Sequence, residues 1–188
     1  MGRWEPDAES RFRAAAIELF GEIGYEQTTV AAIAERAGLT ARTFFRYFAD
    51  KREVLFHGSE RLQQTMVDAL AQAPAEASTV DAIAAALTKA GDFFDDDRRP
   101  IARLRSSVIA ANADLREREL IKMATLSAAL AQALRERGVG EPDASLAAEA
   151  AIAVFRVAFA QWVGESEGRS YGRIVKESLA RLRTIVAC

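Results

Sequence analysis

Cysteine and histidine are almost absent from this chain of 188 residues, which has one cysteine, Cys188, and one histidine, His57. A single cysteine cannot form an intrachain disulfide, so the chain lacks the mark of a disulfide-stabilised secreted domain. Zinc sites and Ser-His-Asp triads need more histidine or cysteine than the chain supplies. The three carboxylates of Asp95–Asp97 diverge from consecutive backbone positions. We therefore predict no metal site, no cofactor and no catalytic residues.

Nucleotide-binding loops and membrane signals are also missing. Gly21, Gly24 and Gly38 fall at expected helix ends, and their spacing fits neither common phosphate-binding motif. The charged start, MGRWEPDAES, does not resemble a signal peptide, so we expect a cytoplasmic protein. The most apolar stretch, residues 146–163, has Arg156 near its middle, and we expect no membrane partner.

Positive charge is scarce overall but locally concentrated. The formal net charge is −2, which argues against a protein that coats nucleic acid without specificity. Residues 36–52 nevertheless contain five basic residues against one acid, Asp50. The five are Arg36, Arg42, Arg46, Lys51 and Arg52. This narrow basic segment favours a specific nucleic-acid reader over a catalytic protein.

The same segment has the pattern of two short helices joined by a tight turn. Apolar residues spaced for one helix face begin after Thr28 or Thr29, either of which can serve as N-cap. Gly38 can adopt the left-handed conformation that ends a helix, and Leu39 can then fill the angle between the two helices. The stripe of the first helix consists of Val30, Ile33, Ala34 and Ala37.

The second helix separates an inner from an outer face. Thr40 is its expected N-cap, and Phe44 and Phe48, four residues apart, face inward. This arrangement leaves Ala41, Arg42, Thr43 and Arg46 pointing outward, with Phe45 and Tyr47 on the flanks. In helix-turn-helix proteins the start of the second helix meets base edges in the major groove. We therefore predict that this helix reads DNA.

At these residues the chain resembles the TetR family of transcriptional regulators. The family pattern is T-x-x-x-I-A-x-x-A-G-[LV]-[ST]-x-x-x-[FL]-[YF]-x-[YH]-F-x-x-K, and the chain matches it in register from Thr29 to Lys51. The preceding stretch, SRFRAAAIELFGEIGYEQTT, is similar to the family's first helix. We expect that helix to bury Phe12, Ala16, Leu19, Phe20 and Ile23.

The resemblance implies particular contacts with DNA. Arg42 and Thr43 occupy the positions of base readers, and Thr29, Thr40, Tyr47 and Lys51 those of phosphate contacts. Arg42 stands where many members have a small residue, and Phe45 replaces a common tyrosine, which removes a hydroxyl bond to phosphate. Arg46 can compensate by reaching a phosphate, or it can read a base. The full expected set is Thr28, Thr29, Thr40, Ala41, Arg42, Thr43, Phe45, Arg46, Tyr47 and Lys51.

The rest of the chain is helical by pattern, so the predicted fold class is all-α. We predict a helix-turn-helix domain over 1–50 and a helical effector-binding and dimerisation domain over 51–188. The breaks indicate helices near 51–72, 80–95, 100–112, 114–137, 144–166 and 170–187. Nine helices in total would match the family. Asn112 to Asp114 could be a break or a polar turn within one long helix.

The last two helices are expected to form a dimer interface. Residues 146–163 are apolar almost all round, which requires cover on more than one side. In TetR-like proteins the last two long helices pair with their copies in a four-helix bundle, and a two-fold dimer presents two reading helices to matched half-sites. The expected interface residues are Phe159, Trp162, Val175, Leu179, Leu182 and Val186.

The resemblance also implies an effector pocket between the reading helices and the dimer interface. An apolar or aromatic small molecule would be its ligand. These residues would serve equally well as dry core, and Arg105 would serve equally well in a salt bridge. The expected lining residues are Leu62, Met66, Phe93, Phe94, Leu104, Arg105, Val108, Met123 and Phe155.

These patterns together predict a sequence-specific DNA-binding regulator that is not an enzyme. In this family the usual role is a repressor that acts as a homodimer and leaves operator DNA when a small molecule binds. The alternatives are an activator or ligand-independent regulator of the same fold, or a small all-helical binding protein or enzyme with an incidental helix-turn-helix. The basic residues on the recognition face favour the regulators.

Overall fold

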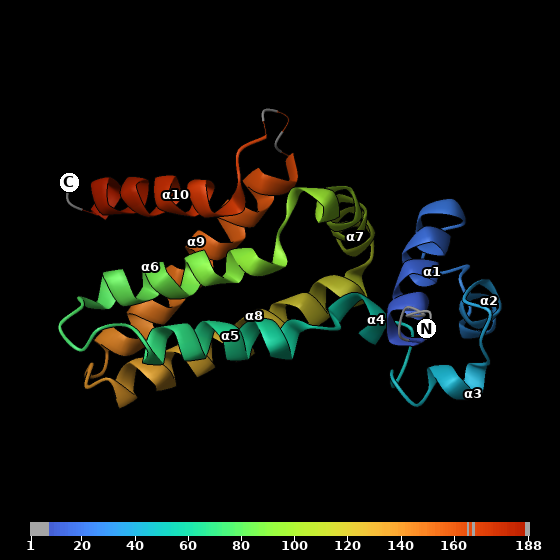
Figure 1. Cartoon of the computed structure of the whole chain (residues 1–188), viewed down its shortest axis with the longest axis horizontal. Coiled ribbons are helices and arrows are strands. Elements are labelled where there is room, and N and C mark those ends of the chain that lie inside the picture. The colour runs from blue at the N-terminus through green and yellow to red at the C-terminus, as the bar shows by residue number, and fades with distance from the viewer. Residues whose placement is uncertain (1–7, 165, 167, 187–188) are drawn as a thin grey trace, which may run out of the picture. The chain divides into compact units, whose positions relative to one another are not determined.

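A computed structural model describes residues 8–164, 166 and 168–186, and in this part of the chain the regular structure is entirely helical (Figure 1). The all-α prediction is therefore confirmed. The α-helices are α1 (Ala8–Glu22), α2 (Val30–Arg36), α3 (Ala41–Phe44), α4 (Glu53–Phe56), α5 (Ser59–Ala71), α6 (Thr79–Lys89), α7 (Arg99–Ala111), α8 (Ala113–Glu136), α9 (Asp143–Gly164) and α10 (Tyr171–Val186). Two short 3₁₀ helices, η1 (Ala90–Phe93) and η2 (Asp96–Arg98), lie between α6 and α7.

The helices form two compact units. The head comprises the described residues up to His57 together with Ile101–Glu119, and the body comprises Gly58–Pro100 and the described residues from Leu120 onward. The head is thus built from two separate stretches of chain, whereas the sequence suggested a boundary after residue 50. The head's inclusion of residues 101–119 follows from their packing, because Val108, Ile109 and Leu115 belong to the same buried cluster as α1.

The core of the head is rich in phenylalanine. Phe12 of α1 meets Phe44 edge to face, with ring centroids 5.2 Å apart and an interplanar angle of 82°. Phe48 lies 5.1 Å from Phe44 and 6.3 Å from Phe12. Such edge-to-face pairs add to the apolar burial that holds α1, α3 and the segment after α3 together. Ile23 was expected in this core but is 49% exposed, because α1 ends one residue earlier, at Glu22.

One helix boundary differs from the sequence prediction, and one that the sequence left open is settled. The expected helix over 51–72 is interrupted at Gly58, whose φ of 87° no other residue type adopts at low cost. The described residues therefore contain ten α-helices rather than nine. Between α7 and α8, Asn112 breaks the helix, and its side-chain amide donates to the Val108 carbonyl at 2.7 Å. Of the two possibilities open for this segment, the structure has the break.

In the body, α6 packs against α5, α9 and α10, and α9 packs against α10 (Figure 1). Helix α9 is long and apolar enough to cross a membrane by length and composition, with a mean hydropathy of 1.5 over its most apolar window, of which 39% is buried. Core helices have the same signature. The residues that α9 buries include Ala148, Ile152, Phe155 and Trp162, so one side of the helix is core.

Candidate nucleic-acid interface

The turn between α2 and α3 is fixed by capping hydrogen bonds. The hydroxyl oxygen of Thr29 accepts from the Ala32 N–H at 3.1 Å, and that of Thr40 accepts from the Thr43 N–H at 3.1 Å. Gly38 has a φ of 65°, and the Leu39 N–H donates to the Ala34 carbonyl at 2.9 Å. This is the geometry by which a left-handed glycine ends a helix. Both expected caps thus have local structural roles that leave their side chains at the surface.

The second helix presents its polar side outward. Phe44 and Phe48 are 0% and 2% exposed, whereas Phe45 and Tyr47 are 59% and 41% exposed. Arg42 and Arg46 are exposed as well, and Ala41 and Thr43 are half-buried. The guanidinium of Arg46 lies 5.8 Å from the centre of the Tyr47 ring. The predicted base and phosphate contacts of this helix therefore lie together on one accessible side.

Thr28 differs from the other expected contacts. Its residue is 1% exposed, and its hydroxyl donates to the Gly24 carbonyl at 2.8 Å. Burial and an internal acceptor leave this side chain without access to a phosphate. The assignment of Thr28 to the DNA-binding set is not supported, and its role is to hold the turn that precedes α2.

Lys51 also has an internal role. Its ammonium donates to the carbonyls of Tyr25, Glu26 and Thr28 at 2.8, 3.3 and 3.1 Å. The Nζ atom lies 4.3 Å from the centre of the Tyr25 ring, as expected for a cation–π contact. Burial raises the pKa of Tyr25 to about 12. Lys51 therefore ties the end of the recognition segment to the α1–α2 turn, a role that the sequence pattern did not reveal.

Other basic residues in the segment are paired within the head. Arg36 forms ion pairs with Glu22 at 2.7 Å and Glu18 at 3.4 Å. The hydrogen bond from Arg36 lowers the pKa of Glu22. In contrast, Arg42 and Arg46 have no ion pair within the described residues. Of the five basic residues in the segment 36–52, Arg42 and Arg46 thus present exposed guanidinium groups that have no ion pair among the described residues.

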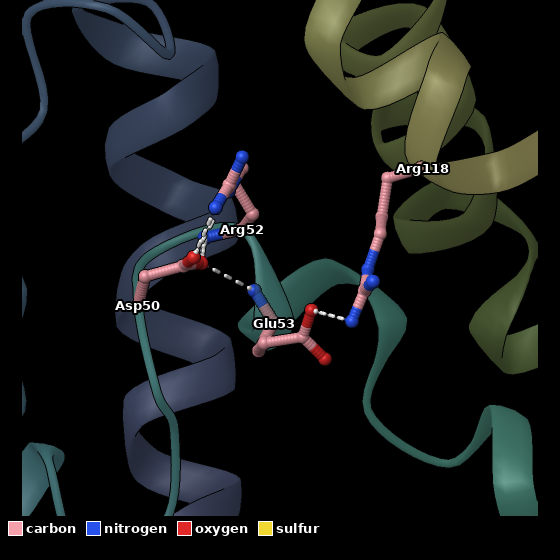
Figure 2. Close-up of polar contacts among 4 residues, drawn as sticks. All are labelled: Asp50, Arg52, Glu53 and Arg118. Atoms are coloured by element: carbon pink, nitrogen blue, oxygen red, sulfur yellow. Dashed lines mark hydrogen bonds and ion pairs between the residues drawn. The ribbon is translucent and has the colours of Figure 1, made fainter. Parts of the chain in front are cut away.

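Figure 2 shows how α4 begins. Asp50 Oδ1 accepts from the backbone N–H groups of Arg52 at 2.7 Å and Glu53 at 3.2 Å, and Oδ2 accepts from the Arg52 guanidinium at 2.6 Å. Burial works to raise the pKa of Asp50, but these hydrogen bonds outweigh it and lower the pKa. Asp50 thus satisfies two backbone N–H groups at the start of α4. The Glu53 side chain pairs with Arg118 at 2.5 Å (Figure 2).

Three of the expected pocket residues belong to the head. Val108 lies in its buried core, and Leu104 packs against that core. The Arg105 side chain donates to the Leu55 carbonyl at 2.7 Å and pairs with Glu119 at 3.3 Å. Desolvation lowers the pKa of Arg105 despite this pairing. Their expected role in an effector pocket is corrected, because these three residues hold α4 to α7 and α8 within the head.

The remaining expected pocket residues lie in the body, where two phenylalanines have different surroundings. Phe93 lines a recess of about 270 Å³, and Arg61 lies over its ring at 5.7 Å. Phe94 instead contacts Phe155, at 5.9 Å between ring centroids. Met66 is fully buried core, while Leu62 and Met123 are half-buried. The recess is polar rather than apolar, and its lining consists of Arg61, Thr65, Lys89, Asp92, Phe93 and Arg98.

Several expected interface residues are part of the subunit core. Trp162 and Val175 are both 0% exposed, and Leu179 is 8% exposed. Phe159 lies 5.3 Å from Phe94 in an aromatic cluster. For Trp162, Val175 and Leu179 the assignment to a dimer interface is corrected, because they are already buried within one chain. Phe159 is half-buried, and its place in an interface stays a prediction. Leu182 remains half-buried.

Helices α9 and α10 have an outer apolar surface that includes one expected interface residue, Val186. Leu146 and Val157 on α9 are 66% and 50% exposed, and Ile185 and Val186 on α10 are 72% and 73% exposed. Ala153 and Ala160, also exposed, lie on the side of α9 that carries Val157. Leu146, Val157 and Ile185 were not among the expected interface residues. The spacing of apolar residues did not single out Leu146 or Val157, because α9 is apolar on nearly every side.

Comparison with known proteins places this geometry in a family. Residues 12–57 match the model described as "Bacterial regulatory proteins, tetR family", and residues 77–187 match the "MftR C-terminal domain". The chain belongs to the TetR family. It is a DNA-binding transcriptional regulator with the family's all-helical fold, and the prediction that it is not an enzyme is confirmed, because the family is not enzymatic.

Individual relatives agree with this placement. The TetR family member is 41% identical over 71 residues to the HTH-type transcriptional regulator TcmR of Streptomyces glaucescens, a match that covers 38% of this chain and 31% of that protein. The chain therefore spans less than a third of that relative's length. This match supports the family assignment without carrying over the whole relative's partners.

Solved structures share the whole fold at lower identity. A TetR-family regulator from Syntrophomonas wolfei has a TM-score of 0.68 at 16% identity, covering 96% of this chain and 95% of the other. FadR of Bacillus halodurans has a TM-score of 0.62 at 19% identity over 96% of both chains. FadR of Bacillus subtilis, solved in complex with stearoyl-CoA, has a TM-score of 0.59 at 21% identity, covering 92% and 96%. At these identities the likeness shows the fold alone.

Proposed function

We propose that this TetR family member is a cytoplasmic repressor that binds operator DNA as a homodimer and is released by a small molecule. The observation that carries the proposal is the outer side of the recognition helix. Arg42 in α3 and Arg46 in the turn after it are exposed without ion pairs to other described residues, while Phe44 and Phe48 anchor this segment to the core. Arginine is the side chain that most often contacts guanine edges, and it can also bind phosphate.

Arg42 and Thr43 are the proposed base readers, and Thr29, Thr40, Arg46 and Tyr47 the proposed phosphate contacts. Arg42 lies in the first turn of α3, which is the part of a recognition helix that enters the major groove. The hydroxyls of Thr40 and Thr43 share a hydrogen bond of 2.8 Å. This pair therefore presents a preorganised polar edge at the start of the helix.

A homodimer is supported by the outer apolar surface of α9 and α10. Leu146, Val157, Ile185 and Val186 are each at least half exposed. Exposed apolar surface of this kind usually marks a contact with another macromolecule. A two-fold axis along this surface would pair identical helices and place two recognition helices on half-sites about one DNA turn, or roughly 34–36 Å, apart.

Release by a small molecule is the remaining part of the proposal. FadR of Bacillus subtilis, which shares this fold, was solved in complex with stearoyl-CoA, and that complex supports an effector for this chain that is at least partly apolar. An effector that binds the DNA-free arrangement more tightly would shift the population of dimers away from operator binding. Operator DNA must then weaken effector binding by the same factor.

Selection from random duplex DNA tests the proposal, because it measures sequence preference and half-site spacing together. The expected result is an enriched inverted repeat whose half-sites are separated by about one helical turn. A matched selection with Arg42→Ala should lose preference at one position in each half-site. Failure to enrich any sequence would overturn operator binding, and enrichment of single half-sites would overturn the homodimer. A promoter–reporter fusion carrying the selected site should be less active when the protein is present, whereas higher activity would indicate an activator.

A further inference from the structure

The body contains polar side chains that are buried without a hydrogen-bond partner among the described residues. They include the indole N–H of Trp162, the hydroxyl of Tyr171 and the hydroxyl of Ser178. Trp162 is 0% exposed and Tyr171 is 1% exposed. Buried polar atoms in folded proteins nearly always have partners, and those that lack one call for an explanation. Phenylalanine would fill the place of Tyr171 without leaving a buried hydroxyl unsatisfied.

Trp162 and Tyr171 meet in one aromatic cluster around Phe94. The Phe94 ring centroid lies 4.7 Å from that of Tyr171, 5.5 Å from that of Trp162 and 5.3 Å from that of Phe159. Tyr171 also packs on the backbone of η1, since a Cβ on Gly91 would lie 3.4 Å from its ring. The two unsatisfied donors therefore belong to residues that pack around a single ring.

Phe94 is the member of this cluster that lies outside an α-helix. It is half-buried and follows η1, with φ of −124° and ψ of 67°, in the irregular link before η2. The rings around it come from the longer helices α9 and α10. Rotation of the Phe94 side chain would therefore vacate a flat aromatic space while leaving the surrounding helices in place.

The charge around the cluster limits what could replace Phe94. The Arg99 guanidinium lies 5.3 Å from the Trp162 ring centre, but it pairs with Asp96 at 2.5 Å and donates to the Arg169 carbonyl at 3.0 Å. Its charge is thus already compensated. The Tyr171 hydroxyl is protonated at neutral pH, as an ordinary tyrosine is, and burial raises its pKa further. The indole N–H can only donate and the hydroxyl can also donate, so the cluster holds two donors and no uncompensated charge.

We propose that Phe94 occupies the binding site of a neutral, flat aromatic molecule with a carbonyl-type oxygen, to which Trp162 and Tyr171 donate hydrogen bonds. The molecule displaces the Phe94 side chain and satisfies the two buried donors. This inference rests on the proposed function only in identifying the molecule as the effector. Binding itself is a property of the body, and it can be tested without operator DNA.

A pair of fluorescent naphthalenes tests the site. The first probe is 6-propionyl-2-dimethylaminonaphthalene, which carries a ketone, and the second is 2-dimethylaminonaphthalene, which lacks it. Trp4→Phe leaves Trp162 as the sole tryptophan, so energy transfer from Trp162 to each probe reports binding near the cluster. We expect the ketone probe to bind more tightly than the ketone-free probe.

Two variants separate the hydrogen bond from the packing. Tyr171→Phe should weaken the ketone probe about 3- to 10-fold, the usual effect of one net hydrogen bond, and leave the ketone-free probe unchanged. Phe94→Ala should strengthen both probes, because the displaced ring is already missing. The matched control is Tyr25→Phe, a buried tyrosine of the head, which should change neither affinity. Thermal melts of each variant establish that the protein is folded.

Three results would overturn the proposal. The first is that the ketone probe does not bind up to its solubility limit. The second is that the parent and Tyr171→Phe bind this probe with equal affinity. The third is that Tyr171→Phe and Tyr25→Phe change its affinity equally. Binding to the selected duplex DNA is measured on the same samples. If the protein binds DNA but not the ketone probe, this site is refuted and the proposed function stands. If it binds the probe but recognises no DNA, the proposed function is refuted and the site stands.

Discussion

Lys51→Met removes an ammonium while it keeps a long apolar stem, and the expected result is a less stable head. The ammonium contacts three backbone carbonyls of the α1–α2 turn at 2.8–3.3 Å and lies 4.3 Å from the Tyr25 ring centre. The turn is otherwise held by the Thr28 hydroxyl and one backbone bond from the Thr28 N–H to the Tyr25 carbonyl. Lys51 is therefore a principal support of the turn that leads into α2.

The size of the effect follows from these contacts. A hydrogen bond to a charged group contributes about 1.5–3 kcal/mol, but one ammonium is shared among three acceptors, and water can replace it at those that are exposed. Ordering a lysine side chain costs about 1.5–2 kcal/mol of entropy, which the variant partly recovers. A net loss of about 1 kcal/mol remains. For a protein of this size that corresponds to a fall in Tm of roughly 2–4 °C.

Thermal and denaturant unfolding measure the loss, and Arg46→Met provides the matched control. Arg46 is exposed, and its guanidinium stacks only weakly on Tyr47, at 5.8 Å from the ring centre, so this variant should change stability by less than about 0.5 kcal/mol. The slope of the logarithm of DNA affinity against the logarithm of salt concentration is measured in parallel. Loss of one phosphate contact should reduce its magnitude by about 0.9.

We expect Lys51→Met to lower the stability of the protein. If Arg46 contacts phosphate, Arg46→Met should reduce the slope of DNA affinity against salt concentration. An unchanged Tm for Lys51→Met with a slope reduced by about 0.9 would refute the structural role. That result would mean that the ammonium is available to phosphate in solution, as the sequence pattern alone suggested.

Three further predictions concern base reading, dimerisation and pH. Arg42→Ala should cost about 1–3 kcal/mol of operator affinity and relax preference at one base per half-site; equal weakening of selected and random duplexes would contradict base reading. Val157→Glu should produce a folded monomer in sedimentation. The side chain is exposed in one subunit, so the charge leaves folding intact, but a dimer would bury that charge unpaired. A stable dimer would exclude Val157 from the interface. Asp50→Ala should lower stability at pH 7 by about 1 kcal/mol. The pKa of Asp50 is lowered in the folded protein. Its stabilisation is therefore present above the ordinary pKa of about 3.9 and is lost as the pH falls through the folded value. The difference in unfolding free energy between the parent and Asp50→Ala should thus shrink below about pH 4, and a constant difference would contradict the role of the Asp50 charge.

Local signals in the sequence predicted the reading helices well. Apolar spacing, Gly38 and the capping threonines act within one or two turns, so a pattern of neighbouring residues contains the information. The same reasoning predicted the buried Phe44 and the exposed Arg42 of α3 and the buried Phe48, although α3 ends at Phe44 and Phe48 lies beyond it. Whether those exposed residues contact DNA stays a prediction.

Contacts between distant parts of the chain were harder to foresee. The acceptors of Lys51 are backbone carbonyls more than twenty positions earlier, and carbonyls leave no trace in residue identity. Helix α9 is apolar on nearly every side, so periodicity could not separate Trp162, which is core, from Val157, which is exposed. The break at Gly58 was not predicted, because one helix was expected over 51–72.

The discontinuous head limits how this regulator could be recombined with others. Its buried cluster takes Val108, Ile109 and Leu115 from a stretch more than forty residues beyond His57, and Arg105 and Arg118 bond to α4 from that same stretch. A chimaera that exchanged residues 1–57 alone would join two halves of a core selected in different proteins. Successful exchange of DNA specificity should therefore require cotransfer of residues 101–119, and natural recombination between such genes should succeed most often where both stretches come from one parent.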